Sequence, residues 1–328
     1  MKRILSGVRP TGQLHLGNLL GALENWKKIQ NEKCFFMIAD WHALSSEYAN
    51  AGMIKNNIFQ VAVDFISAGL DPEKSIIFLQ SWVPEHAELH LLLSMIVPLP
   101  WLKRNPTYKE QLQEVKGRDL ATYGFLGYPV LQAADIILYK ADTVPVGMDQ
   151  LPHLELCREI VRRFNYLYKT DILVEPQPLL TRVPKLPGID GRKMSKSFDN
   201  CIYLNDRGKD LEKKILNMFT DPARKRKTDK GHPAICPVFQ YHQIFNKKEA
   251  EEITALCSQA KIGCVECKRK LLAILEEVLQ PIWARREDLE KTPDLVWDIL
   301  KDGSRQARDT ARKTLRQIIK AVGLPEDN

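Results

Sequence analysis

Two short stretches of the chain carry side chains suited to binding phosphate groups. The first, His15-Leu-Gly-Asn18, follows the turn Arg9-Pro-Thr11 and precedes a helical pattern with Leu19, Leu20, Leu23 and Trp26 on one stripe. It therefore predicts a helix N-terminus, whose free N–H groups and partial positive charge attract anions. The second, Lys193-Met-Ser-Lys-Ser197, supplies two lysines that can act as mobile point charges on a polyphosphate. Each stretch alone is also compatible with an ordinary surface loop.

A third stretch, Tyr128–Tyr139, places a carboxylate on an otherwise apolar helix. Pro129 is expected in the first turn of that helix. Tyr128, Gln132 and Asp135 follow one another at spacings of four and three, so they share one face. A carboxylate there is costly unless it is paired. It is therefore partly exposed, or caps a neighbouring backbone group, or contacts a ligand.

The elements that position these stretches predict an α/β fold. Apolar runs at 3–8, 34–39 and 75–79 read as strands, and helical patterns at 19–26 and 54–70 separate them. This alternation indicates a doubly wound, parallel, Rossmann-like sheet with ligands at the carboxyl ends of its strands. Prolines and glycines mark a connecting insertion at about 98–127, helical over 107–119. A short strand follows at 143–146, where Pro145 favours the edge of the sheet.

The last third of the chain is predicted to be a separate helical domain. We therefore expect a catalytic domain at 1–200 and an all-helical domain at 201–328. Residues 201–328 hold 25 Lys and Arg against 20 Asp and Glu, whereas the first 200 hold 23 against 21. This excess favours a polyanionic partner. The final helical pattern carries Arg305, Arg308, Arg312 and Arg316 on one stripe, either as a solvated face or as a contact with RNA.

Four of the seven cysteines are grouped as Cys236-x20-Cys257-x6-Cys264-x2-Cys267. No secretory signal and no membrane-spanning segment is expected, which favours the cytoplasm, where disulfides are rare. Four thiolates suit a tetrahedral zinc ion or a [4Fe–4S] cluster. Zinc ribbons usually have two Cys-x2-Cys knuckles, and only one is present. The spacing therefore favours iron–sulfur over zinc.

The two phosphate-binding stretches together resemble the signatures of class I aminoacyl-tRNA synthetases. His15–Asn18 is similar to the "HIGH" element, with Asn18 in place of the second histidine, and Lys193–Ser197 matches the "KMSKS" element. Tyr128–Ile136 and Ala141–Gln150, reading YPVLQAADI and ADTVPVGMDQ, narrow the resemblance to the tryptophanyl-tRNA synthetases. The resemblance is close over residues 1 to about 200 and looser beyond.

The resemblance implies an ATP-dependent tryptophan–tRNA ligase. It would activate L-tryptophan to tryptophanyl-adenylate and transfer it to the 3′ end of tRNA(Trp), with Mg²⁺ accompanying ATP. Lys196, Lys193 and Ser195 would be the catalytic residues. The implied ATP-binding residues are Arg9, Pro10, Thr11, His15, Gly17, Asn18, Gly147, Met148, Asp149, Leu186, Lys193, Met194, Ser195, Lys196 and Ser197. The implied tryptophan-binding residues are His42, Tyr128, Gln132, Asp135, Val144, Val146 and Gln150.

The resemblance also implies a role for Asp135 and a set of partners. The Asp135 carboxylate would accept the indole N–H, while Tyr128 and Gln150 would hold the α-ammonium group. A homodimer formed partly through the insertion, an anticodon-reading helical domain and, in a subset of the family, an iron–sulfur cluster are further implications. Tyrosyl-tRNA synthetase, another nucleotidyltransferase, and an iron–sulfur RNA-binding regulator with a relic nucleotide site are the alternatives.

Overall fold

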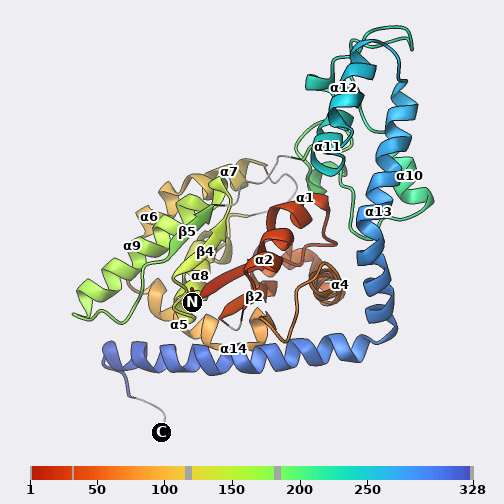
Figure 1. Ribbon diagram of the computed structural model, residues 1–328. Helices are drawn as coiled ribbons and strands as arrows, with labels where there is room; N and C mark the ends of the chain where they lie inside the picture. Colours follow the sequence, from red (N-terminus) through yellow and green to blue (C-terminus); the bar gives the residue numbers. More distant parts are fainter. Residues whose placement is uncertain (1, 32, 115–119, 181–185, 326–328) are drawn as a thin grey trace. The chain divides into compact units, whose positions relative to one another are not determined.

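The computed structural model of the chain describes residues 2–31, 33–114, 120–180 and 186–325 (Figure 1). These residues divide into two compact units. The sheet unit is drawn from Met1–Gly12, Asn25–Arg182 and Thr292–Asn328, and the helical unit from Gln13–Glu24 and Val183–Lys291. The last segment of the chain thus returns to the sheet unit, whereas the sequence predicts one boundary at residue 200.

The sheet unit is built on a five-stranded parallel sheet with the order β3-β2-β1-β4-β5. The central strands β1 (Ile4–Val8) and β2 (Cys34–Ile38) pair in register from Ile4 opposite Cys34 to Val8 opposite Ile38. β2 is buried along its whole length, as a strand covered on both faces must be. β3 (Ile76–Leu79) lies at one edge. The predicted doubly wound fold is confirmed.

The prediction that Pro145 marks an edge strand is wrong. β4 (Thr143–Val146) lies between β1 and β5 (Gln177–Leu180). Its register with β1 consists of Ile4 opposite Thr143 alone, whereas its pairing with β5 covers the whole strand. Pro145 therefore lies beyond the paired stretch of β1, where its missing N–H costs no ladder bond. The sequence did not predict β5, which is short and mostly half-exposed or exposed.

Helices surround this sheet. α8 (Tyr123–Leu138) begins earlier than predicted because the Thr122 hydroxyl accepts a hydrogen bond from the Phe125 N–H and caps the helix. Pro129 therefore lies inside α8, not in its first turn. The predicted helix at 107–119 is present as α7 up to Glu114, and its remainder lies outside the described residues. The other helices of the sheet unit are α2 (Glu24–Ile29), α3 (Asp40–Glu47), α4 (Ile54–Ser67), α5 (Glu85–Ser94), α6 (Leu99–Arg104), α7 (Pro106–Glu114) and α9 (Leu151–Leu167).

The C-terminal helix α14 (Pro293–Ala321) covers the edge of the sheet at β3 (Figure 1). The approach is so close that a Cβ on Gly303 would lie 1.9 Å from the Ile77 carbonyl oxygen, so only glycine fits. The Ser304 hydroxyl accepts a hydrogen bond of 3.1 Å from the Leu79 N–H. α14 thereby shields the edge strand from water and from other strands.

The helical unit contains the remaining helices. α10 (Lys209–Leu216) packs on the long helix α13 (Cys264–Lys291) through buried leucine and isoleucine side chains. α11 (Pro237–Phe245) and α12 (Ala250–Ser258) complete the unit, together with the short helix α1 (Leu16–Asn18) and the π-helical turn Leu19–Leu23. None of the helices in the described ranges is long and apolar enough to cross a membrane.

Candidate functional site

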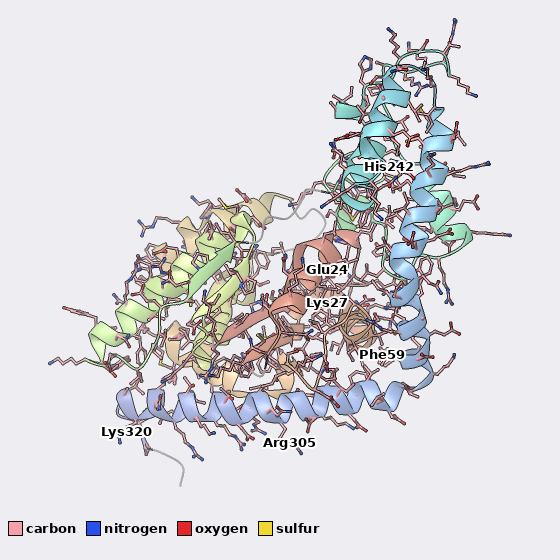
Figure 2. The ribbon with its side chains drawn as sticks, in the orientation of Figure 1. Glu24, Lys27, Phe59, His242, Arg305 and Lys320 are labelled. Atoms are coloured by element: carbon pink, nitrogen blue, oxygen red, sulfur yellow. The ribbon has the colours of Figure 1, made fainter. Side chains whose placement is uncertain are left out.

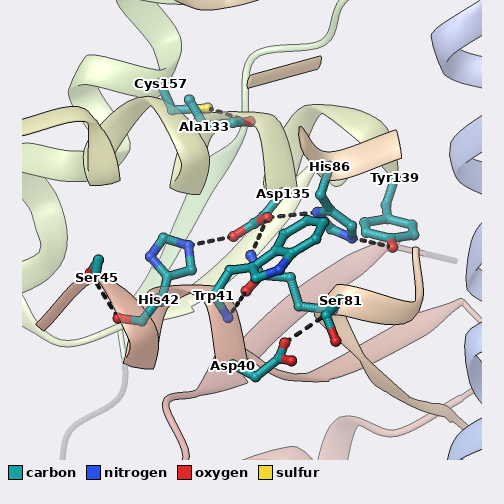
Figure 3. A network of polar contacts seen from close by, with 11 residues as sticks. Asp40, Trp41, His42, Ser45, Ser81, His86, Ala133, Asp135, Tyr139 and Cys157 are labelled. Atoms are coloured by element: carbon teal, nitrogen blue, oxygen red, sulfur yellow. Dashed lines mark hydrogen bonds and ion pairs between the residues drawn. The ribbon is translucent and has the colours of Figure 1, made fainter. Parts of the chain in front are cut away.

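The Asp135 carboxylate of α8 is buried at the centre of a polar network in the sheet unit (Figure 3). Its Oδ2 lies 2.7 Å from the Nε2 of His42, which is on α3. Its Oδ1 lies 2.6 Å from the Nδ1 of His86 on α5 and accepts a hydrogen bond of 2.8 Å from the Gln80 amide. Gln80 directly follows β3, so the network forms at the carboxyl end of a parallel strand, as the fold predicts.

The neighbours of this network keep the carboxylate ionised. Burial by itself would raise the pKa of Asp135, but the facing His42 and His86 rings outweigh it and hold that pKa well below its usual value. Burial raises the pKa of Tyr139 well above its usual value, so its hydroxyl keeps its proton. This hydroxyl lies 2.8 Å from the His86 Nε2. Asp135 is thus an acceptor of hydrogen bonds and not a donor.

Other residues predicted to bind tryptophan also lie in the sheet unit. Val144 and Val146 are buried on β4. The buried Tyr128 hydroxyl lies 2.9 Å from His153 Nε2, and burial lowers the pKa of His153 to about 4, so that ring is neutral near pH 7. Gln132 and Gln150 are half-buried, and the Gln150 amide donates to its neighbour Asp149.

The sequence did not single out Gln80, His86, Tyr139 or His153. Each is a polar residue in an apolar segment, which is the same signal that identified Asp135. Nothing in the spacing along the chain tells which of these segments meet, because the contacts of Asp135 span from 49 to 93 residues. Only the fold brings these residues together.

The first phosphate-binding stretch forms a cap at the N-terminus of α1. The His15 Nδ1 accepts a hydrogen bond of 3.3 Å from the Asn18 N–H, and the Asn18 side-chain oxygen accepts one of 3.1 Å from the His15 N–H. Burial and the nearby Lys196 ammonium group lower the pKa of His15 to about 4. His15 is therefore neutral, and its remaining nitrogen, Nε2, carries a proton that it can donate to a phosphate.

The second stretch lies beside the first in the helical unit. The segment around His15 runs antiparallel to Ile202–Leu204, with hydrogen bonds from the Leu16 N–H to the Ile202 carbonyl and from the Leu204 N–H to the Leu14 carbonyl. A Cβ on Gly17 would lie 3.7 Å from the Met194 sulfur and 2.9 Å from the His15 ring, so glycine is required there. The structure thus brings the two stretches together, as expected for one phosphate site.

A buried asparagine, Asn200, holds the lysine-bearing loop. Its side-chain oxygen accepts a hydrogen bond of 2.8 Å from the Ser195 N–H, and its amide donates one of 3.0 Å to the Lys193 carbonyl. The Lys193 side chain is exposed, whereas Met194 and Leu186 are buried. The Ser197 side chain lies outside the described residues. The sequence did not predict this role for Asn200.

The remaining predicted ATP-binding residues belong to the sheet unit. Gly12 has a φ of 123°, and the Thr11 N–H donates to the Arg9 carbonyl at 2.8 Å, so the turn after β1 is tight. Gly147 precedes the turn Met148–Gln150, and a Cβ there would lie 2.6 Å from the exposed Asp149 carboxylate. Met148 is exposed.

The four clustered cysteines are half-buried and free in the helical unit. Burial, with a smaller contribution from the other three thiols, raises the pKa of Cys267 to about 12. Cys267 Sγ lies 3.4 Å from the Nε2 of His242 on α11 (Figure 2), and an Arg224 N–H lies 3.7 Å from Cys257 Sγ. Within the described residues, no group of three or more His, Cys, Asp or Glu side chains is close enough to hold a metal ion.

The arginine stripe of α14 is partly occupied within the sheet unit. Arg308 and Arg312 each donate through Nε to the buried Glu85 carboxylate, at 2.9 and 3.0 Å, and Arg305 (Figure 2) pairs with Asp302. Two of the four arginines thus fasten α14 to α5.

Comparisons with known proteins agree on one family. The model of the class I tRNA synthetases (W and Y) matches residues 1–280. A tryptophan–tRNA ligase of Thermotoga maritima is 52% identical over 98% of this chain and 99% of its own length. One from Aquifex aeolicus is 45% identical over 98% of this chain and 100% of its own length.

Solved structures give the same result. The tryptophanyl-tRNA synthetase of Campylobacter jejuni, in complex with ADP and tryptophan, superposes with a TM-score of 0.88 at 31% identity, covering 98% of this chain and 100% of that one. A tyrosyl-tRNA synthetase of Archaeoglobus fulgidus superposes with a TM-score of 0.65 at 21% identity, which shows a shared fold only.

Proposed function

Since the chain belongs to the tryptophanyl-tRNA synthetases of class I, and is therefore a tryptophan–tRNA ligase, we propose how its own residues divide the work of the reaction. A tryptophan carboxylate oxygen attacks the α-phosphorus of ATP. The bond from that phosphorus to the bridging oxygen breaks, and pyrophosphate leaves. A hydroxyl of the terminal ribose of tRNA(Trp) then attacks the acyl carbon and displaces AMP. Neither step needs a protein nucleophile.

Asp135 selects the amino acid. The indole N–H can only donate, and an ionised carboxylate can only accept, so the two are complementary. Phenylalanine has no ring N–H and would leave this acceptor position of the buried Asp135 unfilled. The protein should therefore select tryptophan over phenylalanine by about 10⁴-fold. Val144 and Val146 line the ring, with His42 and Gln132 beside it, and Tyr128 and Gln150 hold the α-ammonium group. The buried position of Asp135, with His42, Gln80 and His86 around its carboxylate, is the observation that carries this proposal.

Two groups of residues hold ATP. The Mg²⁺ that accompanies ATP is coordinated by phosphate oxygens and water. Lys196 and Lys193 stabilise the charge on the α-phosphate and pyrophosphate, Ser195 and Ser197 add hydroxyl contacts, and neutral His15 donates from Nε2. Gly17 and Asn18 complete this group. Arg9, Pro10 and Thr11 seat the nucleotide, and Gly147, Met148, Asp149, Leu186 and Met194 line the adenosine. The pairing of His15 with the Lys196 loop supports this assignment.

Pyrophosphate exchange tests the assignment. With ATP, we expect exchange with tryptophan and none with tyrosine or phenylalanine at the same concentration, followed by charging of tRNA(Trp). Lys196→Ala should lower kcat by about 10²-fold or more, because one stabilising charge is lost. The matched control is Lys209→Ala, which changes an exposed lysine in the same way. Exchange with tyrosine alone would reject the substrate, and an unchanged kcat in Lys196→Ala would reject the role of that lysine.

The four cysteines are assigned to a [4Fe–4S] cluster, with zinc as the alternative. Four free, half-buried cysteines at this spacing support the proposal, with Arg224 and His242 nitrogens beside the sulfurs of Cys257 and Cys267. A single zinc ion needs all four sulfurs about 2.3 Å from one centre. The spacing of the four cysteines, with a single Cys-x2-Cys pair, favours the cluster over zinc. When bound, the cluster would fasten α11, α12 and α13 together. A visible absorption spectrum and metal analysis of anaerobically purified protein decide between the two.

The helical unit is assigned to tRNA binding, together with Arg305 and Arg316, the two arginines of the α14 stripe that do not bind Glu85. A cleft of about 520 Å³ is lined by basic residues of the run Arg224–Lys227 together with Arg269, beside Cys264. Phosphate groups bind such side chains through charge. Reversal of charge at Arg226 should weaken tRNA charging and leave pyrophosphate exchange unchanged. A loss of exchange as well would argue against this assignment.

A homodimer in the cytoplasm completes the proposal. Leu91, Met95 and Leu99, on and just after α5, expose more than half of their surface, and Tyr123 does so at the end of the insertion. Neighbouring exposed apolar side chains of this kind mark a protein–protein contact. Sedimentation analysis should give twice the mass of the chain, and Met95→Glu should shift the equilibrium toward the monomer.

A further inference from the structure

The hydrogen-bond partners of Asp135 leave a defined place for one more donor. An ionised carboxylate has about four lone-pair positions, two on each oxygen. Oδ1 already receives Gln80 and His86, so both of its positions are filled. Oδ2 receives His42. Among the described residues, three donors therefore face the carboxylate, and the open position is on Oδ2.

Each donor on Oδ1 is itself held in one orientation. The Gln80 side-chain oxygen accepts a hydrogen bond of 3.2 Å from the Trp41 N–H, so its NH₂ group must face Asp135. On the other side, the Tyr139 hydroxyl lies 2.8 Å from the His86 Nε2, and this contact holds the ring with its Nδ1–H toward the carboxylate. Gln80, His86 and Tyr139 are all fully buried, so water does not replace these contacts.

From this geometry we infer that Gln80 and His86 are specificity-determining positioning residues, and that Trp41 and Tyr139 act through them. By filling both positions on Oδ1, they fix the carboxylate plane and leave Oδ2 as the single acceptor for the ring N–H of the substrate. This inference rests on the proposed recognition of tryptophan by Asp135 and deepens it. Neither Gln80 nor His86 needs to touch the substrate.

A purely structural role makes a different prediction. A buried carboxylate needs partners whatever its task, and removing one destabilises any site. A structural role therefore affects every substrate that occupies the pocket. A role in aiming Oδ2 affects only substrates whose ring carries an N–H. A tryptophan isostere with sulfur in place of the ring nitrogen has nearly the same shape and no N–H, so it separates the two.

The test is the ratio of kcat/KM for tryptophan to that for the sulfur isostere, measured by pyrophosphate exchange. In the unchanged protein this ratio should be large. Gln80→Leu and His86→Leu should lower it about tenfold or more, the value of one hydrogen bond to a charged group. His86→Asn keeps an N–H close to the Nδ1 position and should retain most of the ratio. Tyr139→Phe should lower it less than His86→Leu does.

Controls make every outcome informative. Tyr166, which is exposed, gives the matched control Tyr166→Phe with an unchanged ratio. If both substrates lose activity in parallel in Gln80→Leu and His86→Leu, the residues are structural and the inference is overturned. If these variants do not fold, Tyr139→Phe and His86→Asn carry the test, and an unchanged ratio in Tyr139→Phe overturns the role of Tyr139. A ratio near one in the unchanged protein would overturn the recognition by Asp135 itself.

Discussion

The Asp135 network and the cysteine cluster are both polar groups inside the molecule, but they differ in completeness. Around Asp135, three donors are in place and two of them are held by further contacts. Around the cysteines, two of the four sulfurs have a nitrogen neighbour, and burial, with a smaller contribution from neighbouring thiols, raises the pKa of Cys257 and Cys267. The first arrangement is finished before its ligand arrives. In the second, the four thiols are free.

The difference teaches how each site is stabilised. An ionised group that is fully paired contributes to folding by itself, and its ligand adds only the last contact. Thiols gathered without a metal repel one another once ionised, so their site depends on what they bind. We therefore expect changes near Asp135 to act on selectivity, and changes near the cysteines to act on stability.

The largest effect is expected for Asp135→Asn. An amide at this position turns its NH₂ group either toward His42 or toward Gln80 and His86, and the charge that accepts the indole N–H is lost. The value of kcat/KM for tryptophan should fall on the order of 10³-fold. Pyrophosphate exchange measures it, with the exposed Asp171→Asn as control. A loss of less than tenfold would contradict the assigned role.

The next effect is expected for Cys264→Ser. If the four thiolates hold a cluster, this variant loses visible absorbance, and its unfolding midpoint falls by about 5 °C or more. Asp135→Asn should keep the absorbance, which separates the two sites. A Cys264→Ser variant with the spectrum and midpoint of the unchanged protein would show that the cysteines bind nothing.

A smaller effect is expected for Glu85→Gln. The buried Glu85 carboxylate joins α14 to α5 through Arg308 and Arg312, whose side chains are 39% and 51% exposed. Water screens these arginines, so the free energy of unfolding should fall by only about 1 kcal/mol. Denaturant titration measures it. Glu88→Gln, on the exposed side of the same first turn, should leave the free energy of unfolding unchanged. An equal loss of free energy in both variants would exclude a stabilising role of the Glu85 contacts.

The smallest effect is expected for the contribution of His153 to the pH dependence of stability. His153 has a pKa of about 4 in the folded chain and about 6.5 when unfolded, so its neutral form is favoured by folding. Its contribution is present above pH 6.5 and is lost as the pH falls from 6.5 toward 4. Asp135, whose pKa is lowered, contributes above its unfolded value and loses that contribution only in stronger acid. His153→Gln should therefore flatten the decline of the unfolding midpoint between pH 6.5 and 4.5, and an identical decline would exclude this role of His153.

The sequence predicts the parts of this protein that local patterns determine. The parallel strands at 34–38 and 76–79 and the helix start at His15 follow from apolar runs and turn residues. The place of α14 does not, because an amphipathic stripe does not say which surface it covers. The stripe of arginines is compatible with a solvated face or with a contact with RNA, whereas two of these arginines bind Glu85.

The site was predicted in the same uneven way. Asp135 and His42 came from the motif, but Gln80, His86 and Tyr139 did not, since their contacts join segments far apart in the chain. Pro145 was misplaced because a proline rule for edges cannot tell that β1 pairs with only the first residue of β4.

A structure of the protein with bound tryptophan tests the central claim most directly. The measured quantity is the distance from the indole nitrogen to each oxygen of Asp135. We predict about 2.9 Å to Oδ2, with Gln80 and His86 still bonded to Oδ1. An indole nitrogen bonded to another residue, or an Asp135 side chain turned away from the ring, would contradict it.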